Sequence, residues 1–216
     1  MKITGTALVA VCLAIASCKK QQVQPADVPI PPSYPSYSAL NVGNYWVYER
    51  YFVNLLTDSS AALGVYDSSY VEKDTLINEK NYFKCVTMPY TGFFPTIKFL
   101  RDSLHYIVSS SGEIEFSSVD FSTFFDSDAF GPSLAAMDTV TRNVKMTVRD
   151  STITVPAGSF VASAVTTTYD YADPSKADLH LNAWYAKNIG RVKYIESLFY
   201  RNFEAQELRL LRYHVQ

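Results

Sequence analysis

A strict alternation of apolar and polar side chains marks the segment at residues 140–149. One face of this segment carries Val140, Val144, Met146 and Val148, with Arg142 as the exception, and the other face carries Thr141, Asn143, Lys145, Thr147 and Arg149. A period of two residues is the pattern of a β-strand with one buried face. We therefore predict a strand here that turns its valines toward a core.

Short runs rich in aromatic and β-branched residues recur along the rest of the chain, and turn-forming residues separate them. The first run, NYWVYERYFVNL, spans residues 44–55. Further runs lie at 71–76, 82–88, 96–100, 104–109, 113–117, 151–155, 160–171, 179–186, 191–196 and 207–214. Strands of this length joined by tight turns predict an antiparallel meander.

The predicted fold is therefore all-β and mainly antiparallel: a single curled meander sheet, half-barrel or barrel-like, with at most a short helix. The segment at 119–136, VDFSTFFDSDAFGPSLAA, has no clear period, and its aromatic residues either cover an open sheet face or include that helix. Aromatic residues make up 14% of the chain. On a concave face they would either fill a closed core or enclose an apolar cavity. We favour the filled core, because protein interiors pack at near-crystal density.

The N-terminus has the pattern of a secretion signal. Lys2 precedes an uncharged run at residues 5–16, GTALVAVCLAIA, which is shorter than the roughly 20 residues needed to span a bilayer. The run ends in Ile15-Ala16-Ser17-Cys18, which resembles the lipobox of bacterial lipoproteins. That resemblance implies cleavage between Ser17 and Cys18. It also implies acylation of Cys18 with chains such as palmitate, which together anchor a protein stably in a membrane.

These signals divide the chain into three parts. Residues 1–17 are the predicted lipoprotein signal peptide, 18–38 the lipidated cysteine with a tether, and 39–216 a β-rich globular domain. The tether contains prolines at positions 25, 29, 31, 32 and 35. Proline favours extended conformations, so we interpret this stretch as a semi-rigid spacer. A proline-rich ligand for a partner protein is the alternative.

The residues after Cys18 predict where the protein resides. They are Lys19, Lys20, Gln21 and Gln22, and no acidic residue occurs before Asp27. In the lipoproteins that this segment resembles, an aspartate directly after the cysteine often retains the protein in the inner membrane, and an acidic cluster in some lineages promotes display on the cell surface. Neither signal is present. The expected location is the cell envelope, with the lipid anchor in the outer membrane and the domain facing the periplasm.

Three further stretches, GNYWVY at 43–48, VPAGSF at 155–160 and WYAKNIGRVK at 184–193, are together similar to a group of uncharacterised bacterial envelope lipoproteins. The last two are also similar to periplasmic half-barrel lipoprotein carriers. Arg191 stands where the group usually has an aliphatic residue. Independently of the resemblance, Pro156 ends a strand and Gly158 and Gly190 permit tight turns. The resemblance implies no catalytic residue.

Candidate chemistry is sparse. Three histidines (His105, His180, His214) lack metal-site spacing, and Ser159 lacks the G-x-S-x-G context of a nucleophile. Five aspartates (Asp126, Asp128, Asp170, Asp173, Asp178) offer oxygens to calcium but form no calcium-loop motif. Cys85 has no partner for a disulfide within the domain, and we interpret it as a small buried residue. We expect no cofactor, no metal site and no catalytic residue.

Charge argues against nucleic acid as a partner. The formal net charge is −2 with no basic cluster, whereas nucleic-acid binding calls for a basic patch. The expected partners are the membrane, through the lipid anchor, and a hydrophobic ligand or an envelope protein.

The sequence predicts a membrane-anchored envelope lipoprotein that is a non-catalytic binding or interaction module. The alternative is a periplasmic carrier of lipid or another hydrophobic ligand. A hydrolase with a site assembled from distant residues comes third. An apolar cavity would favour the carrier, whereas a cleft with converging groups of perturbed pKa would favour the enzyme.

The lipobox interpretation makes a direct prediction. Cys18→Ser removes the thiol that accepts the lipid, so the variant should accumulate as unprocessed or soluble protein while the wild type partitions with membranes. Mass spectrometry of the N-terminus and fractionation of cells measure both properties. A variant that is cleaved and membrane-bound like the wild type would refute the lipoprotein assignment.

Overall fold

The computed structural model describes residues 33–130, 139–197 and 204–216, and this part of the chain forms one compact unit with its own core. The strands are β1 (Tyr45–Asn54), β2 (Ser59–Ile77), β3 (Lys80–Met88), β4 (Thr96–Ser103), β5 (Tyr106–Ser109), β6 (Ile114–Ser117), β7 (Asp126–Phe130), β8 (Val140–Val155), β9 (Gly158–Tyr171), β10 (Leu179–Ala186), β11 (Gly190–Ser197) and β12 (Glu204–His214). They confirm the predicted all-β, antiparallel fold, and these described residues contain no helix.

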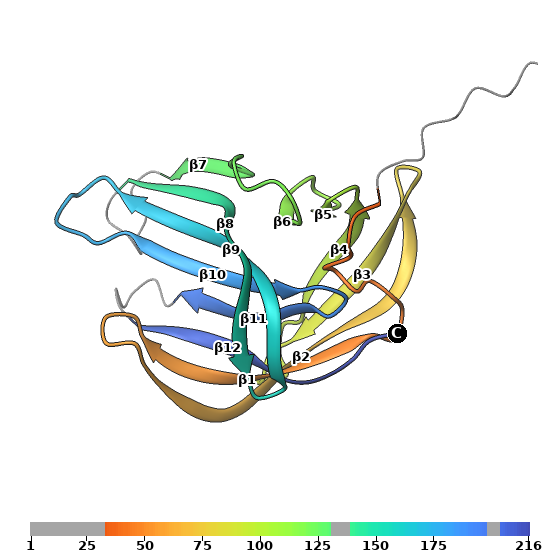
Figure 1. Ribbon diagram of the computed structural model, residues 1–216, viewed down its shortest axis with the longest axis horizontal. Helices are drawn as coiled ribbons and strands as arrows, with labels where there is room; N and C mark the ends of the chain where they lie inside the picture. The colour runs from red at the N-terminus through yellow and green to blue at the C-terminus, as the bar shows by residue number, and fades with distance from the viewer. Residues whose placement is uncertain (1–32, 131–138, 198–203) are drawn as a thin grey trace, which may run out of the picture. The chain divides into compact units, whose positions relative to one another are not determined.

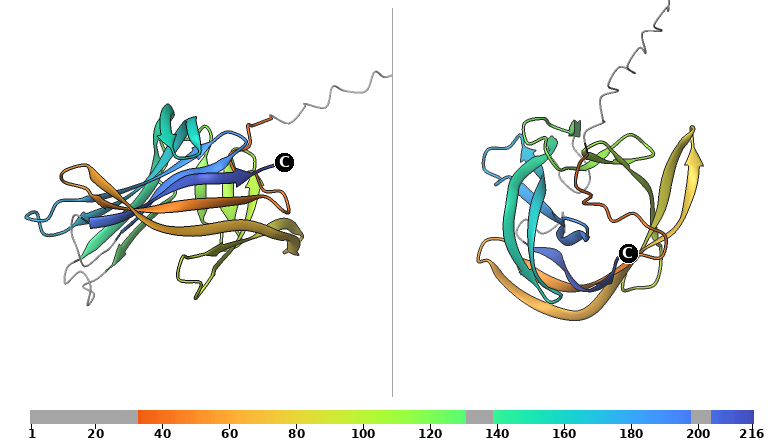
Figure 2. Two further views of the ribbon diagram at one scale, coloured as in Figure 1. Left: turned by 90° about the horizontal axis from the view of Figure 1, so that it is seen from below. Right: turned by 45° about the vertical axis from the view of Figure 1, so that its right-hand side comes forward.

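All twelve strands belong to one sheet, in the order β6-β5-β4-β3-β2-β1-β12-β11-β10-β9-β8-β7. Strands that follow one another in sequence pair with each other, with the exception of β6 and β7, and β1 also pairs with β12. The sheet thus consists of two meanders joined where the first strand meets the last. It curls into a nearly closed barrel whose two edges are β6 and β7 (Figures 1 and 2).

The strands differ from the predicted runs at several places. β4 continues to Ser103, so the predicted run at 104–109 begins only at Tyr106, and Leu104 and His105 lie in the turn between β4 and β5. β2 begins at Ser59, because residues 59–66 pair with β1 through their backbone although they are mostly exposed and contain Gly64. The runs at 140–149 and 151–155 are one strand, β8, with irregular register between Val148 and Ser151. The segment at 119–136 contributes β7, which pairs with β8. The short helix that we allowed for does not occur among its described residues, 119–130, and the rest of it lies outside the described ranges.

Two groups of buried side chains fill much of the interior. One surrounds Tyr48, Val192 and Leu208, and the other surrounds Phe116, Met146 and Tyr185. The Phe116 ring centroid lies 4.7 Å from that of Tyr185, and the Ser117 N–H contacts the Met146 sulfur at 3.5 Å. The short strands β5 and β6 therefore pack against the second meander, β7 to β12, through side chains in the interior. In the described residues, neither β5 nor β6 forms a β-ladder with a strand of that meander.

A segment ahead of β1, which we call the strap (residues 34–40), packs against the inside of the curled sheet. The Asn188 N–H donates to the Ser36 carbonyl at 2.8 Å, and the Ser38 hydroxyl donates to Asp102 Oδ2 at 2.8 Å. The Tyr37 ring centroid lies 4.8 Å from that of Phe116. Figure 2 (right) shows the strap crossing the opening of the barrel. The end of the segment predicted as tether, residues 34–38, is thus in contact with the domain.

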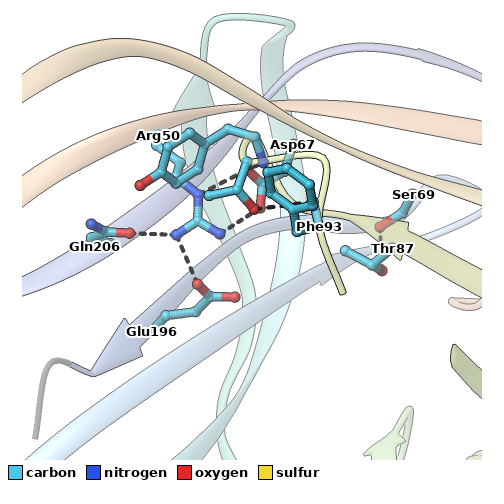
Figure 3. Close-up of polar contacts among 9 residues, drawn as sticks. Arg50, Asp67, Ser69, Thr87, Phe93, Glu196 and Gln206 are labelled. Atoms are coloured by element: carbon cyan, nitrogen blue, oxygen red, sulfur yellow. Dashed lines mark hydrogen bonds and ion pairs between the residues drawn. The ribbon is translucent and has the colours of Figure 1, made fainter. Parts of the chain in front are cut away.

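A buried ion pair links β1 to β2 (Figure 3). Arg50 donates from Nε to Asp67 Oδ1 at 2.8 Å and from Nη2 to Oδ2 at 2.5 Å. Its remaining nitrogen, Nη1, contacts Glu196 at 2.9 Å and the Gln206 side chain. The Tyr90 N–H donates to Asp67 Oδ1 at 3.0 Å, so the same carboxylate holds the loop between β3 and β4.

No helix in the described residues is long and apolar enough to cross a membrane.

Asp67→Asn should destabilise the domain by about 3 kcal/mol, because it leaves the Arg50 guanidinium buried beside a neutral amide. The Arg50 and Asp67 side chains are only 8% and 1% exposed, so solvent cannot replace the lost partner. Urea unfolding followed by circular dichroism measures the change. The control Asp58→Asn, at an exposed turn, should lie within about 0.5 kcal/mol of the wild type. Equal stability of both variants would show that the pair contributes nothing.

Candidate ligand-binding cavity

Two adjoining cavities lie on the concave side of the sheet. The filled core that we expected from packing density is therefore wrong in part, because the interior keeps open space. The first has a volume of about 340 Å³, and its apolar lining includes Leu40, Trp46, Cys85, Leu100 and Ile107. The second has a volume of about 460 Å³ and a more polar lining, which includes Ser111, Glu113, Asp126, Asp128, Arg142 and Thr167. Four residues line both: Lys98, Glu115, Tyr185 and Arg191.

A β-bulge places Arg191 inside the barrel. Tyr185 is opposite Arg191 and Trp184 is opposite Lys193, so Val192 is an extra residue in β11. A bulge of this kind re-aims the side chains beside it. Strict alternation from the inward-facing Tyr194 would have turned Arg191 outward, whereas both cavities include it in their lining.

Gly190 fixes the hairpin that precedes Arg191. Its φ of +94° favours glycine, and an added Cβ would lie 3.3 Å from the Trp46 ring and 3.4 Å from the Ser38 carbonyl. The Trp46 Nε1–H donates to the Ile189 carbonyl at 2.6 Å. The hairpin is therefore held against β1 and the strap, and the position of Arg191 follows from these contacts.

Three tyrosines surround the Arg191 side chain. Its Cζ atom lies 3.6 Å from the Tyr194 ring centroid, and the Tyr48 hydroxyl donates to the Arg191 carbonyl at 2.8 Å. Burial raises the pKa of Tyr48, Tyr185 and Tyr194 above the usual value, although the Arg191 charge opposes the shift. All three phenols are therefore neutral at physiological pH, and none supplies a negative charge to Arg191.

Among the described residues, no carboxylate lies within ion-pair distance of Arg191. Lys98 Nζ contacts Glu115 Oε1 at 2.5 Å, and Glu196 contacts Arg50. None of the ion pairs between described residues includes Arg191. At the junction of the two cavities, two cations therefore face a single carboxylate.

The residues that we considered for catalysis or metal binding do not converge. His105 contacts Ser117, His180 contacts Thr168, and His214 stacks on Tyr45, each in a different part of the sheet. Ser159 contacts Thr154, Asp126 pairs with Arg142, and Asp170 accepts from Asn143. No group of three or more potential metal ligands occurs in the parts of the chain that were described. Ser17 and Cys18 lie outside the described residues.

Sequence reasoning missed the cavity residues because they come from several strands. The available signal was Arg191 itself, a charged residue at a position that is aliphatic in the envelope lipoproteins that its motif resembles. Its inward direction depends on the bulge at Val192, and a register shift of one residue leaves no mark in the sequence pattern.

The described strands thus form a curled, nearly closed antiparallel sheet with two cavities on its concave side. No protein-family model and no curated protein matches the sequence. Among solved structures, one from Bacteroides fragilis is designated by prediction an exported protein with a YmcC-like fold. It aligns with this chain with a TM-score of 0.50 at 12% identity. The alignment covers 84% of this chain and 100% of the other. A predicted lipoprotein from Parabacteroides distasonis aligns with a TM-score of 0.49 at 12% identity, over 85% of this chain and 100% of the other. The chain thus shares its fold with the first of these proteins.

Cys85 lies on β3 and packs against the core beside the first cavity. Burial raises the pKa of its thiol to about 12, with the Arg191 charge opposing the shift. The thiol is therefore protonated at neutral pH and is a poor nucleophile, because the thiolate is the reactive form.

In residues 19–216, Cys85 is the only cysteine, so its reactivity can be measured alone. At pH 8 its reaction with iodoacetamide should be on the order of a thousandfold slower than that of an unfolded control, because a thiol of ordinary pKa is partly ionised there. Adding denaturant should restore the ordinary rate. Equal rates in the folded and unfolded protein would contradict the assignment of a buried, protonated thiol.

Proposed function

We propose that this protein is a non-catalytic binding module of the bacterial cell envelope whose barrel interior holds a small, largely apolar ligand. The observation that carries the proposal is the first cavity. Its volume of about 340 Å³ falls within the range of roughly 300 to 1,000 Å³ typical of ligand pockets, and most of the surface that its lining residues expose to it is apolar.

Two observations support the proposed location in the envelope. The Ile15-Ala16-Ser17-Cys18 sequence resembles a lipobox, which implies a lipid anchor. The fold neighbour from Bacteroides fragilis is designated an exported protein by prediction. We propose that the anchor inserts in the outer membrane with the domain in the periplasm, as the residues after Cys18 favour. In that position the module is suited to carry a lipid or another hydrophobic ligand.

The cavity geometry favours binding over catalysis. A hydrolase needs a nucleophile and a base within hydrogen-bond reach of each other. The first cavity's lining contains Cys85, whose thiol is protonated, and the hydroxyls of Ser38, Ser69 and Thr87. The Ser69 and Thr87 hydroxyls bond to each other, and Ser38 donates to Asp102. The three histidines, the usual bases for such hydroxyls, line neither main cavity. The charged groups at the junction are instead suited to orient a ligand.

Residues 19–216 should enhance the fluorescence of N-phenyl-1-naphthylamine, an uncharged apolar probe, in a saturable manner. Leu100→Trp adds volume to the cavity and should weaken probe binding by about tenfold or more, because filling the pocket excludes the ligand. The control Val161→Trp, on an outward position that is 59% exposed, should bind like the wild type.

Circular dichroism of each variant separates loss of the cavity from loss of the fold. Mass spectrometry of molecules that co-purify with the wild type identifies the natural occupant. Absence of saturable probe binding to a folded wild-type protein would refute the proposed function.

A further inference from the structure

We infer that the ligand is a single-chain amphiphile whose anionic head group binds Arg191 and whose apolar chain lies in the first cavity. This inference rests on the proposed function and deepens it by naming the class of ligand. It depends on the position of one cation, on the volume beside it and on the charges around it.

The first argument is that the Arg191 guanidinium forms no ion pair with a carboxylate of the described residues. Its guanidinium stacks on Tyr194 within the barrel, where a charge is costly unless it is paired. Every other cation in the lining of the two cavities has a carboxylate: Lys98 has Glu115 and Arg142 has Asp126. Among the described residues, Arg191 has none within ion-pair distance. A guanidinium presents a planar fork of donors that matches a carboxylate or a phosphate.

The second argument concerns size and polarity. Arg191 lies at the boundary between the apolar cavity and the polar one. The apolar cavity, of about 340 Å³, holds on the order of ten methylene groups if each takes about the 30 Å³ of a water molecule. One alkyl chain of medium length therefore fits, whereas a diacyl lipid does not. A head group at Arg191 would point into the polar cavity.

The third argument limits the charge of the head group. The polar cavity also contains Glu113 and Asp128, which are exposed, in addition to the paired Asp126. These carboxylates repel a second negative charge placed beyond Arg191. The arrangement therefore favours one compact anionic group over an extended polyanion. A carboxylate, with a single charge, fits this limit best, and a monoalkyl phosphate, which carries up to two charges at neutral pH, fits it less well.

The test measures displacement of N-phenyl-1-naphthylamine from residues 19–216 by four dodecyl compounds below their micellar concentrations. Dodecanoate and dodecyl phosphate carry anions, dodecanol is neutral and dodecyltrimethylammonium is cationic. At least one anion should displace the probe at a concentration about tenfold or more below that of dodecanol, because a hydrogen bond to a charged group contributes enough for that factor. The tighter of the two anions identifies the head group. If dodecanol or the cation binds as tightly as both anions, the inference is wrong.

Variants assign the effect to the residue. Arg191→Met should weaken binding of the preferred anion by about tenfold to a hundredfold and leave dodecanol within about twofold, and Arg191→Lys should recover part of the loss. The control is Lys187→Met, an exposed cation of the same hairpin that is absent from both cavity linings, and it should change nothing. An Arg191→Met protein that still binds dodecanol but keeps its preference for the anion would overturn the inference.

The outcomes also separate the inference from the proposed function. A folded wild type that binds neither the probe nor any dodecyl compound refutes the binding function itself. A wild type that binds the probe but does not prefer an anion refutes only the role of Arg191. If Arg191→Met does not fold, the comparison of the four compounds on the wild type still decides the inference.

Discussion

The pairing of β1 with β12 is the contact on which the rest of the barrel depends. It joins the two meanders into one sheet, and it runs from Tyr45 opposite His214 to Asn54 opposite Glu204. The strands involved are the first and the last of the domain, so the whole chain must be present before this ladder forms. Contacts between residues so far apart in sequence are slow to form. Arg50 on β1 pairs with Asp67 on β2, and it also contacts Glu196 on β11 and Gln206 on β12. These side-chain contacts stabilise the same junction of strands.

The cavities follow from how this barrel is filled. Large aromatic side chains such as Phe116 on β6 and Tyr185 on β10 meet across the concave face and pack the two meanders against each other. Bulky rings leave gaps where a curled sheet offers no small complementary partner, and here the gaps lie on both sides of Arg191. The same residues thus provide the core and define the space for a ligand. A charged residue at the boundary makes that space chemically asymmetric.

The local periodicity was sufficient to predict most strands. The alternation at 140–149 and the turns at Gly158 and Gly190 correspond to β8 and to the ends of the hairpins. It was insufficient where pairing depends on the backbone alone, as in the first half of β2, where exposed residues around Gly64 carry no pattern. The cavity was harder still to predict. Its lining comes from strands at distant positions, and the direction of Arg191 is set by a one-residue bulge at Val192.

The strap connects the proposed binding site to the chain that precedes the domain. Ser38 and Leu40 form part of the wall of the first cavity, and Ser36 and Tyr37 hold the strap to the β10–β11 hairpin and to β6. The chain that leads out of the domain on its N-terminal side is therefore also a wall of the pocket. Tension along that chain would pull on the contacts that Ser36, Tyr37 and Ser38 make with the barrel. A ligand packed against Leu40 would stabilise the same contacts. By thermodynamic linkage, a bound ligand must raise the force needed to peel the strap away, and tension must lower the affinity by the equivalent amount.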